Sequence, residues 1–185
     1  MTRLMKPLLG AVFFAAFLTN VNAQTAPPAD MKHAAKPDKM MTGSDNLWIS
    51  KVAQGGLAEV ELGKLAQERG TSDAVKQFGQ RMVDDHSKAN SELSQLAQSK
   101  GVTVPSGLDA KAQATKDKLS KLSGAAFDRA YITDMVKDHR TDIAEFQKEA
   151  NSGHDAETKA FAAKTLPTLQ EHLRMAEETS NTLKK

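Results

Sequence analysis

Proline is absent from two long stretches of this chain, residues 38–104 and 106–166, and this absence constrains the fold more than any other feature. A proline inside a helix removes a backbone hydrogen bond and clashes with the preceding turn, so these stretches permit unusually long helices. They are rich in Ala, Leu, Lys, Gln and Glu, whereas aromatic residues make up only 5% of the chain. These helix formers predict an all-α fold.

Ser, Asp and Gly residues divide the two stretches into helical segments, because Ser and Asp cap the start of a helix and Gly often follows its end. Residues 59–78 also align without a gap on residues 142–161, which pairs Glu59 with Asp142 and supports two helical hairpins. Pro167 is expected to kink the last helix. We expect four long helices and a short one, at residues 44–69, 72–100, 109–122, 125–151 and 155–183.

The connection between the second and third long helices, residues 101–124, is too long for a tight loop. A helix of about 29 residues is about 43 Å long, and this connection, about half of it helical, reaches about 50 Å. It can therefore return the chain to the opposite end of the bundle. The sequence predicts a ferritin-like four-helix bundle with a short crossover helix between the second and third long helices.

The first 23 residues have the three regions of an export signal. Arg3 and Lys6 make its start positive, an apolar run extends from Leu8 to Leu18, and we predict cleavage after Ala23. The apolar run is too short to cross a bilayer of about 30 Å, so we expect no stable transmembrane span after cleavage. We therefore predict a protein of the periplasm or one associated with the outer membrane.

Cleavage would leave a linker at residues 24–43, predicted to be disordered, and a bundle domain at residues 44–185. It would also remove Arg3 and Lys6, which lowers the number of Lys and Arg residues from 25 to 23, equal to the 23 Asp and Glu residues. A chain without net positive charge lacks the basic surface that nucleic acids require, so no nucleic-acid partner is expected. The chain has no cysteine, so its stability has to come from helix packing.

Four segments carry a resemblance to a known family. They read GGLAEVELG at 55–63, FGQRMVDDH at 78–86, MVKDH at 135–139 and LPTLQEHL at 166–173. In this order, over about residues 45–183, they resemble the bacterial domain-of-unknown-function family 4142. The resemblance implies a ferritin-like fold and an exported or outer-membrane location. It implies no biochemical activity and no functional residues.

One polar residue on each long helix falls on the stripe of apolar residues that is expected to face the core. These residues are Glu59, His86, His139 and His172, and an aspartate lies beside two of the histidines, Asp85 and Asp138. At about 1.5 Å per residue, crossover wiring places the four inward residues in a layer about 7 Å thick, against about 11 Å with short loops. The sequence therefore predicts a polar layer inside the bundle.

Two interpretations of this layer stay open. Imidazole nitrogens and a carboxylate suit a transition metal such as Zn, Cu, Ni or Fe. The four inward residues would then be ligands, and Asp85 or Asp138 would be further ligands or would hold the ligands in place. Alternatively, the layer is a metal-free hydrogen-bond network that satisfies Glu59, because an unpaired buried carboxylate is strongly unfavourable.

Ferritin-type di-iron chemistry is not expected, because it needs a Glu three residues before each of two histidines. Val83, Val136 and Leu169 occupy those positions. The chain also lacks a nucleophile elbow, a phosphate loop and a cysteine nucleophile, so we favour a role without catalysis. The candidates are a metal-binding envelope protein and a structural module with an envelope protein as partner; nothing in the sequence specifies an oligomeric state. A metal-dependent oxidase would also need an open coordination position and a path for its substrate.

Overall fold

The computed structural model describes residues 43–184, and within them it contains five helices and no strand. Four are long, namely α1 (Gly43–Arg69), α2 (Asp73–Ser99), α4 (Gly124–Ser152) and α5 (Ala156–Thr182), and α3 (Ala110–Ser120) is short. The predicted all-α class is confirmed, and every helix begins and ends within two residues of its expected position. The predicted export signal and linker lie outside the described residues, except for Gly43 at the start of α1. Helix α5 continues through Pro167 as one element.

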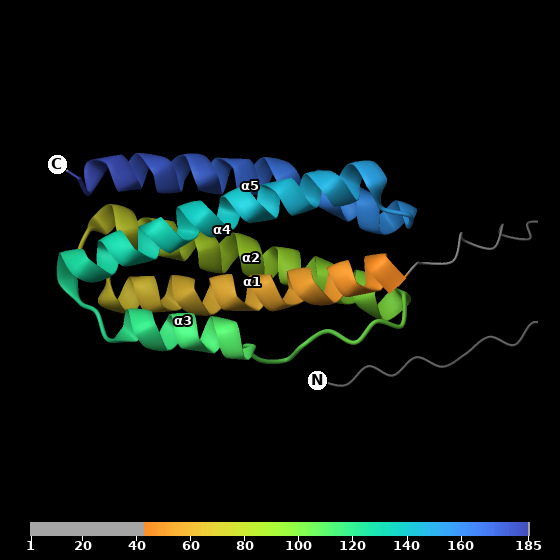
Figure 1. Ribbon diagram of the computed structural model, residues 1–185, viewed down its shortest axis with the longest axis horizontal. Coiled ribbons are helices and arrows are strands. Elements are labelled where there is room, and N and C mark those ends of the chain that lie inside the picture. Colours follow the sequence, from red (N-terminus) through yellow and green to blue (C-terminus); the bar gives the residue numbers. More distant parts are fainter. Residues whose placement is uncertain (1–42, 185) are drawn as a thin grey trace, which may run out of the picture. The chain divides into compact units, whose positions relative to one another are not determined.

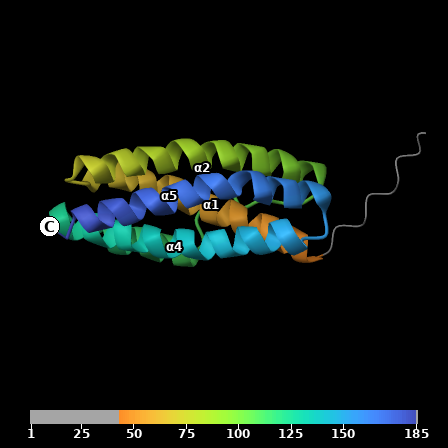
Figure 2. The same cartoon turned by 90° about the horizontal axis from the view of Figure 1, so that it is seen from above.

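The long helices form two antiparallel hairpins packed into a bundle (Figures 1 and 2). Helix α1 packs on α2, α4 packs on α5, and α2 lies next to α5. Because α2 and α4 run in the same direction, the chain has to travel back along the bundle between them. Residues 100–123 make this return, with α3 lying against α1. The connection therefore positions α4 so that its inward face meets α1 and α2 at the middle of the bundle.

Buried carboxylates fasten the two hairpins to each other near both ends of the bundle. Asp128 on α4 accepts hydrogen bonds from the backbone N–H of Thr71 (3.0 Å) and of Ser72 (2.9 Å), in the turn between α1 and α2. At the other end, Asp155 caps the start of α5 and accepts a 2.8 Å bond from Lys100 Nζ, just beyond α2. These bonds limit sliding of one hairpin along the other.

A pair of glycines brings α1 and α2 unusually close together. A Cβ atom at Gly63 would lie 2.7 Å from the carbonyl oxygen of Gly79, and one at Gly79 would lie 2.8 Å from the carbonyl oxygen of Gly63. Both distances are below ordinary van der Waals contact, so only glycine permits this approach of the two backbones. Glu59 and His86 lie on these same two helices, and their distance depends on this spacing.

The apolar interior is divided into two cores. The first, toward the α1–α2 turn, includes Leu62, Phe78, Met82, Phe127, Tyr131, Met135 and Ala176. The second, toward the α4–α5 turn, includes Ile49, Ala53, Leu93, Phe146, Phe161 and Leu169. On each long helix, the predicted polar residue lies between the residues of the two cores; on α1, for example, Glu59 lies between Ala53 and Leu62. A polar layer therefore separates two apolar cores.

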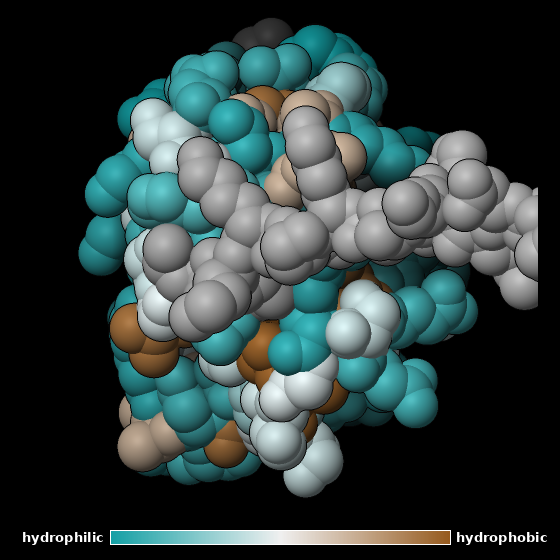
Figure 3. All heavy atoms as spheres, turned by 90° about the vertical axis from the view of Figure 1, so that its right-hand side faces the viewer, coloured by the Kyte–Doolittle hydropathy of each residue, from teal (hydrophilic) through white to brown (hydrophobic). Residues whose placement is uncertain are grey.

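The surface is polar where it is visible from the end of the bundle that holds the α4–α5 turn (Figure 3). Hydrophobic residues appear there only in small separate patches. Among residues 43–184, Leu47 is the one large hydrophobic residue that is highly exposed, at 73%. No helix in this part of the chain is both long enough and apolar enough to span a membrane. The apolar residues of the described domain therefore serve mainly to pack its interior.

Candidate metal centre

Four buried polar residues, one from each long helix, meet in the layer between the two cores. Glu59 and His86 are each 6% exposed, and His139 and His172 are fully buried. The three imidazole rings lie close together, with ring centroids 5.2 to 5.9 Å apart. Each ring offers one nitrogen as a possible ligand atom, and these three nitrogens all lie within 4.8 Å of one another. The structure thus brings together the four residues that the helical period turned inward.

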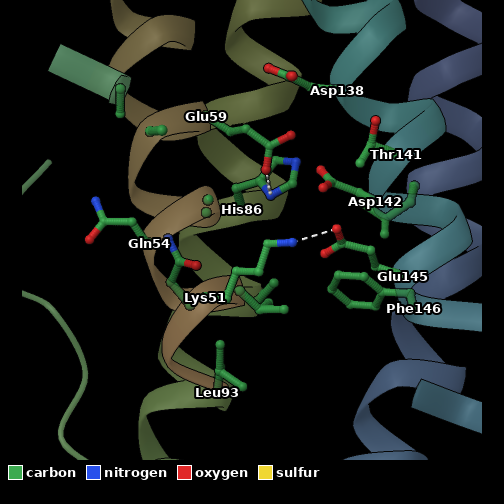
Figure 4. Close-up of a pocket in the computed structure, with 18 of the residues that line it drawn as sticks. Lys51, Gln54, Glu59, His86, Leu93, Asp138, Thr141, Asp142, Glu145 and Phe146 are labelled. Atoms are coloured by element: carbon green, nitrogen blue, oxygen red, sulfur yellow. Dashed lines mark hydrogen bonds and ion pairs between the residues drawn. The ribbon is translucent and has the colours of Figure 1, made fainter. Parts of the chain in front are cut away.

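Glu59 and His86 form a buried pair (Figure 4). His86 Nδ1 lies 2.9 Å from Glu59 Oε2, and Glu59 Oε1 lies 3.5 Å from His139 Nε2. Burial by itself would raise the pKa of Glu59, but attraction to His86 and His139 lowers it to about 2. Burial by itself would lower the pKa of His86, but attraction to Glu59 and the hydrogen bond with it raise that pKa above its ordinary value. Glu59 is therefore an anion, and it holds the N–H of His86 Nδ1.

The other polar atoms of this pair are unsatisfied. His86 Nε2 and Glu59 Oε1 are buried, and neither has a hydrogen-bond partner among the described residues. Buried polar atoms without a partner are uncommon in folded proteins and call for an explanation, such as an unseen ion or water. Because Glu59 holds His86 Nδ1, Nε2 is the nitrogen of His86 that remains to bind a ligand.

His139 is oriented by the backbone of its own helix. Its Nδ1 lies 3.0 Å from the carbonyl oxygen of Met135. Because a carbonyl oxygen only accepts, Nδ1 must carry the hydrogen and donate it. Burial lowers the pKa of His139 below its ordinary value, which favours the neutral ring at neutral pH. In the neutral ring, Nε2 then carries the lone pair.

His172 is oriented by Asp85. Its Nε2 lies 2.8 Å from Asp85 Oδ2, and Arg81 Nε donates a 2.5 Å bond to the same oxygen. Burial would raise the pKa of Asp85, but the bonds from His172 and Arg81 lower it, so Asp85 is an ionised acceptor. His172 Nε2 must therefore donate its hydrogen. Burial lowers the pKa of His172 to about 4, so the ring is neutral at neutral pH and its lone pair is on Nδ1.

These two lone pairs face each other. His139 Nε2 and His172 Nδ1 are 3.3 Å apart, and the hydrogen of each neutral ring is held by another acceptor. Two facing lone pairs repel unless a cation lies between them. Two ligands bound tetrahedrally to a metal at about 2.0–2.1 Å are about 3.4 Å apart. The spacing of the two nitrogens therefore suits a metal ion.

The whole donor set fits a three-histidine metal site. His86 Nε2, His139 Nε2 and His172 Nδ1 are the available nitrogens, and the second nitrogen of each ring donates to Glu59, to the Met135 carbonyl or to Asp85. Metal-binding histidines usually have their second N–H held in this way by a carboxylate or a carbonyl, which fixes the tautomer and the ring orientation. Three imidazoles also leave a further coordination position for water or another ligand.

Asp85 and Asp138, the two aspartates predicted next to histidines, occupy different places. Asp85 contacts His172 directly, whereas Asp138 is half-buried in the wall of a cavity that Glu59 and His86 also line (Figure 4). Burial and repulsion from Glu59 raise the pKa of Asp138. Within the described residues, the group with metal-ligand spacing contains the three histidines and not Asp138.

Asp142 and Glu145 were not among the predicted site residues, although both line the same cavity. With Asp138 they recur at intervals of four and three residues along α4, which places three carboxylates on one face of this helix. Burial and repulsion from Glu59 raise the pKa of Asp142 to about 8. The helical spacing of the acids, and the alignment of Asp142 with Glu59, were the sequence signals that could have identified them.

Comparison with known proteins identifies a family and a fold. The sequence profile described as "Domain of unknown function (DUF4142)" matches residues 30–179. Among solved structures, the crystal structure of a DUF305 fragment from Deinococcus radiodurans matches with a TM-score of 0.68 and 13% sequence identity. The match covers 77% of this chain and 98% of that one, and at this identity it shows similarity of fold alone. No curated protein matches this chain.

Proposed function

This chain belongs to the DUF4142 family of unknown function, and from its own geometry we propose that it binds a transition-metal ion through His86, His139 and His172. Glu59 and Asp85 hold two of these rings by their second nitrogens. The binding site lies between α2, α4 and α5, in the polar layer that separates the two apolar cores. The role proposed is metal binding or handling without catalysis.

The observation that carries the proposal is the 3.3 Å contact between His139 Nε2 and His172 Nδ1. His139 Nδ1 donates its hydrogen to the Met135 carbonyl, and His172 Nε2 donates its hydrogen to Asp85. Neither neutral ring therefore has a second hydrogen to donate to the other ring. An extra proton would also relieve the repulsion, but burial disfavours a charged ring at both positions. A metal ion relieves it and also uses His86 Nε2, which otherwise has no partner in the described structure.

Nitrogen ligands favour the later first-row metals. Among Zn, Cu, Ni and Fe, three imidazole ligands bind Cu²⁺ most strongly, and they also suit the tetrahedral preference of Zn²⁺. A di-iron centre does not fit, since Val83, Val136 and Leu169 occupy the positions where bridging glutamates would stand. We therefore propose Zn²⁺ or copper as the resident ion.

Two further features belong to the proposal. Helices α2 and α4 run in the same direction, and the segment that connects them returns along α1. This connectivity supports a ferritin-like bundle. The charged and apolar segments of residues 1–23 support export to the periplasm or the outer membrane. Amino-terminal sequencing of the protein recovered from the envelope fraction tests the latter, with cleavage after Ala23 as the expected result.

Calorimetric titration of the full chain with Zn²⁺, after removal of bound metals with a chelator, tests the metal site. We expect one ion per chain in the wild-type protein and loss of this binding in His139→Gln and in His172→Gln. The matched control is His154→Gln, because His154 is an exposed histidine at the α4–α5 turn. Circular dichroism establishes that each variant is helical. Unchanged stoichiometric binding in the two buried variants would contradict the proposal.

A metal-free structural module is the alternative, and two contacts favour it. The bonds from His86 to Glu59 and from His172 to Asp85 need no metal, and both help to fix the register of the helices. In this case the protein would contact an envelope protein, and its thermal unfolding would be the same after chelation and after addition of Zn²⁺. Metal binding predicts a different result: free Zn²⁺ at 100 times Kd stabilises by about 2.7 kcal/mol, which raises Tm by about 5–11 °C.

A further inference from the structure

A cavity of about 340 Å³ opens between α1, α2 and α4, with the start of α3 at its rim. Its walls become progressively more buried inward: Lys51 and Thr141 are exposed, Asp138 and Asp142 are half-buried, and Glu59 is buried. Figure 4 shows Glu59 and His86 together at one side of the cavity, facing the carboxylates of α4. The cavity therefore leads from the surface to the buried pair that adjoins the three histidines.

The charged side chains that line this cavity are mostly acidic. Its carboxylates outnumber its amines, and one of the amines, that of Lys51, is already paired with Glu145. The carboxylates are Glu59, Asp109, Asp138, Asp142 and Glu145, against Lys51 and Lys111. A cleft lined by one sign of charge concentrates ions of the opposite sign and raises their rate of association. The cavity is thus suited to attract a small cation.

Other approaches to the three histidines are closed in the part of the chain that the structure describes. Along the bundle axis, the first and second apolar cores lie on either side of the polar layer. On the side of α5, His172 is fully buried behind Asp85, which Arg81 also holds. The cavity is the approach that carries carboxylates and is open to the surface.

Glu59 connects the cavity to the metal centre. Its side chain lines the cavity, while its two oxygens reach His86 Nδ1 at 2.9 Å and His139 Nε2 at 3.5 Å. It is 6% exposed, and its Oε1 has no hydrogen-bond partner within residues 43–184. An unsatisfied carboxylate oxygen between an acidic cavity and the imidazoles is a natural intermediate ligand for an arriving cation.

We propose that the cavity is the path by which a hydrated divalent transition-metal cation reaches the three histidines, with Asp138 and Asp142 as its outer binding groups and Glu59 as the residue that passes it inward. This inference rests on the proposed metal site. At each stage one bound water is exchanged for one protein oxygen or nitrogen, and no covalent bond of the protein changes. The path accounts for Glu59 Oε1, which has no hydrogen-bond partner in the described domain, and for the acidic face of α4, neither of which the metal site itself uses.

Stopped-flow mixing of the metal-free full chain with Co²⁺, followed by the visible absorbance of the bound ion, tests the path. For the double variant Asp138→Asn/Asp142→Asn we expect association to slow by about tenfold, because the arriving ion loses two carboxylate ligands along the path. Dissociation should slow in parallel, because the ion leaves by the same path, so Kd should change by less than about threefold. The matched control is Glu177→Gln/Glu178→Gln, which removes two carboxyl groups from the surface of α5 and should leave the rates unchanged.

A second variant tests the path without changing charge. A Cβ atom at Gly55, on the rim of the cavity, would meet no other part of the described domain within 4 Å, so we expect Gly55→Leu to fold and its side chain to narrow the opening. It should slow association and dissociation together. This variant decides the question if the double variant does not fold.

Each outcome separates the path from the site. If no protein binds Co²⁺, the metal site is wrong and the path falls with it. If Co²⁺ binds but both cavity variants associate as fast as the surface control, the path is wrong and the site stands. If the double variant instead weakens Kd by tenfold or more through faster dissociation, Asp138 and Asp142 are ligands in the final complex, and that also overturns the path.

Discussion

Replacement of Gly63 by alanine sets two effects of known size against each other. Alanine is a better helix former than glycine in the interior of a helix, which favours the variant by about 1 kcal/mol. Against this, the new Cβ atom would lie 2.7 Å from the carbonyl oxygen of Gly79, 3.1 Å from Val83 Cγ2 and 3.2 Å from Met82 Cβ. The nearest of these atoms belongs to the backbone of α2 and cannot rotate away.

Relief of this contact requires α1 and α2 to separate by about 0.7 Å near Gly63, and a gap of that size forfeits a quarter to a half of each dispersion contact along the interface. Overpacking of a close interface typically costs about 1–3 kcal/mol, and a rigid backbone obstacle places Gly63→Ala near the upper value. After subtraction of the helix-propensity gain, we expect a net loss of about 2 kcal/mol, equivalent to a fall in Tm of about 4–8 °C.

Urea denaturation monitored by circular dichroism measures the effect, and Gly55→Ala is the matched control. Gly55 lies in the same helix, and a Cβ atom there would meet nothing within 4 Å in the described domain. It should therefore show only the propensity gain, a stabilisation of about 1 kcal/mol. If Gly63→Ala proves as stable as Gly55→Ala, the close approach of α1 and α2 does not limit stability and the reasoning is refuted.

Three further predictions concern buried or partly buried carboxylates. Asp128→Ala removes the acceptor of two backbone N–H groups and should lower the free energy of unfolding by about 2–3 kcal/mol in urea denaturation; a loss below 0.5 kcal/mol would mean that water replaces these bonds. Burial would raise the pKa of Asp155, but its bonds from Lys100 and Thr158 lower it, so the stability it provides is complete above about pH 4 and is lost as pH falls through the lower folded-state value. The difference in Tm between wild type and Asp155→Asn should accordingly shrink below about pH 4, and a constant difference down to pH 2 would contradict this. Asp85→Asn should weaken Zn²⁺ binding by about 10–100-fold in calorimetry while the protein remains folded, because Asp85 orients His172 but is not itself a ligand; an unchanged Kd would show that the orientation is set elsewhere.

The helices and the height of the polar layer could be predicted because both follow from local geometry. A helix has a fixed rise and a fixed period, so the positions of Glu59, His86 and His139 along the bundle follow from counting residues once the turns are located. Ser, Asp and Gly at the segment boundaries located those turns to within two residues. The direction of the second hairpin followed from the length of the connection through α3.

The detailed wiring of the site could not be predicted, because it depends on which helices are neighbours around the bundle. Asp85 and Asp138 each precede a histidine, yet Asp85 turns toward α5 and bonds His172, whereas Asp138 lines the cavity beside α1. The helical period gives the rotation of a side chain about its own axis and does not identify the helix that it faces. The lone pairs of His139 and His172 likewise follow from partners that only the packed structure supplies.

The division of the interior into two apolar cores has a consequence for the lifetime of anything bound between them. An ion at the imidazoles is enclosed by hydrocarbon in both directions along the bundle, so it can leave only sideways, past Glu59 and through the cavity between α1, α2 and α4. Its residence time would then depend on this single lateral exit as well as on the strength of the metal–nitrogen bonds, because the two cores close the other directions.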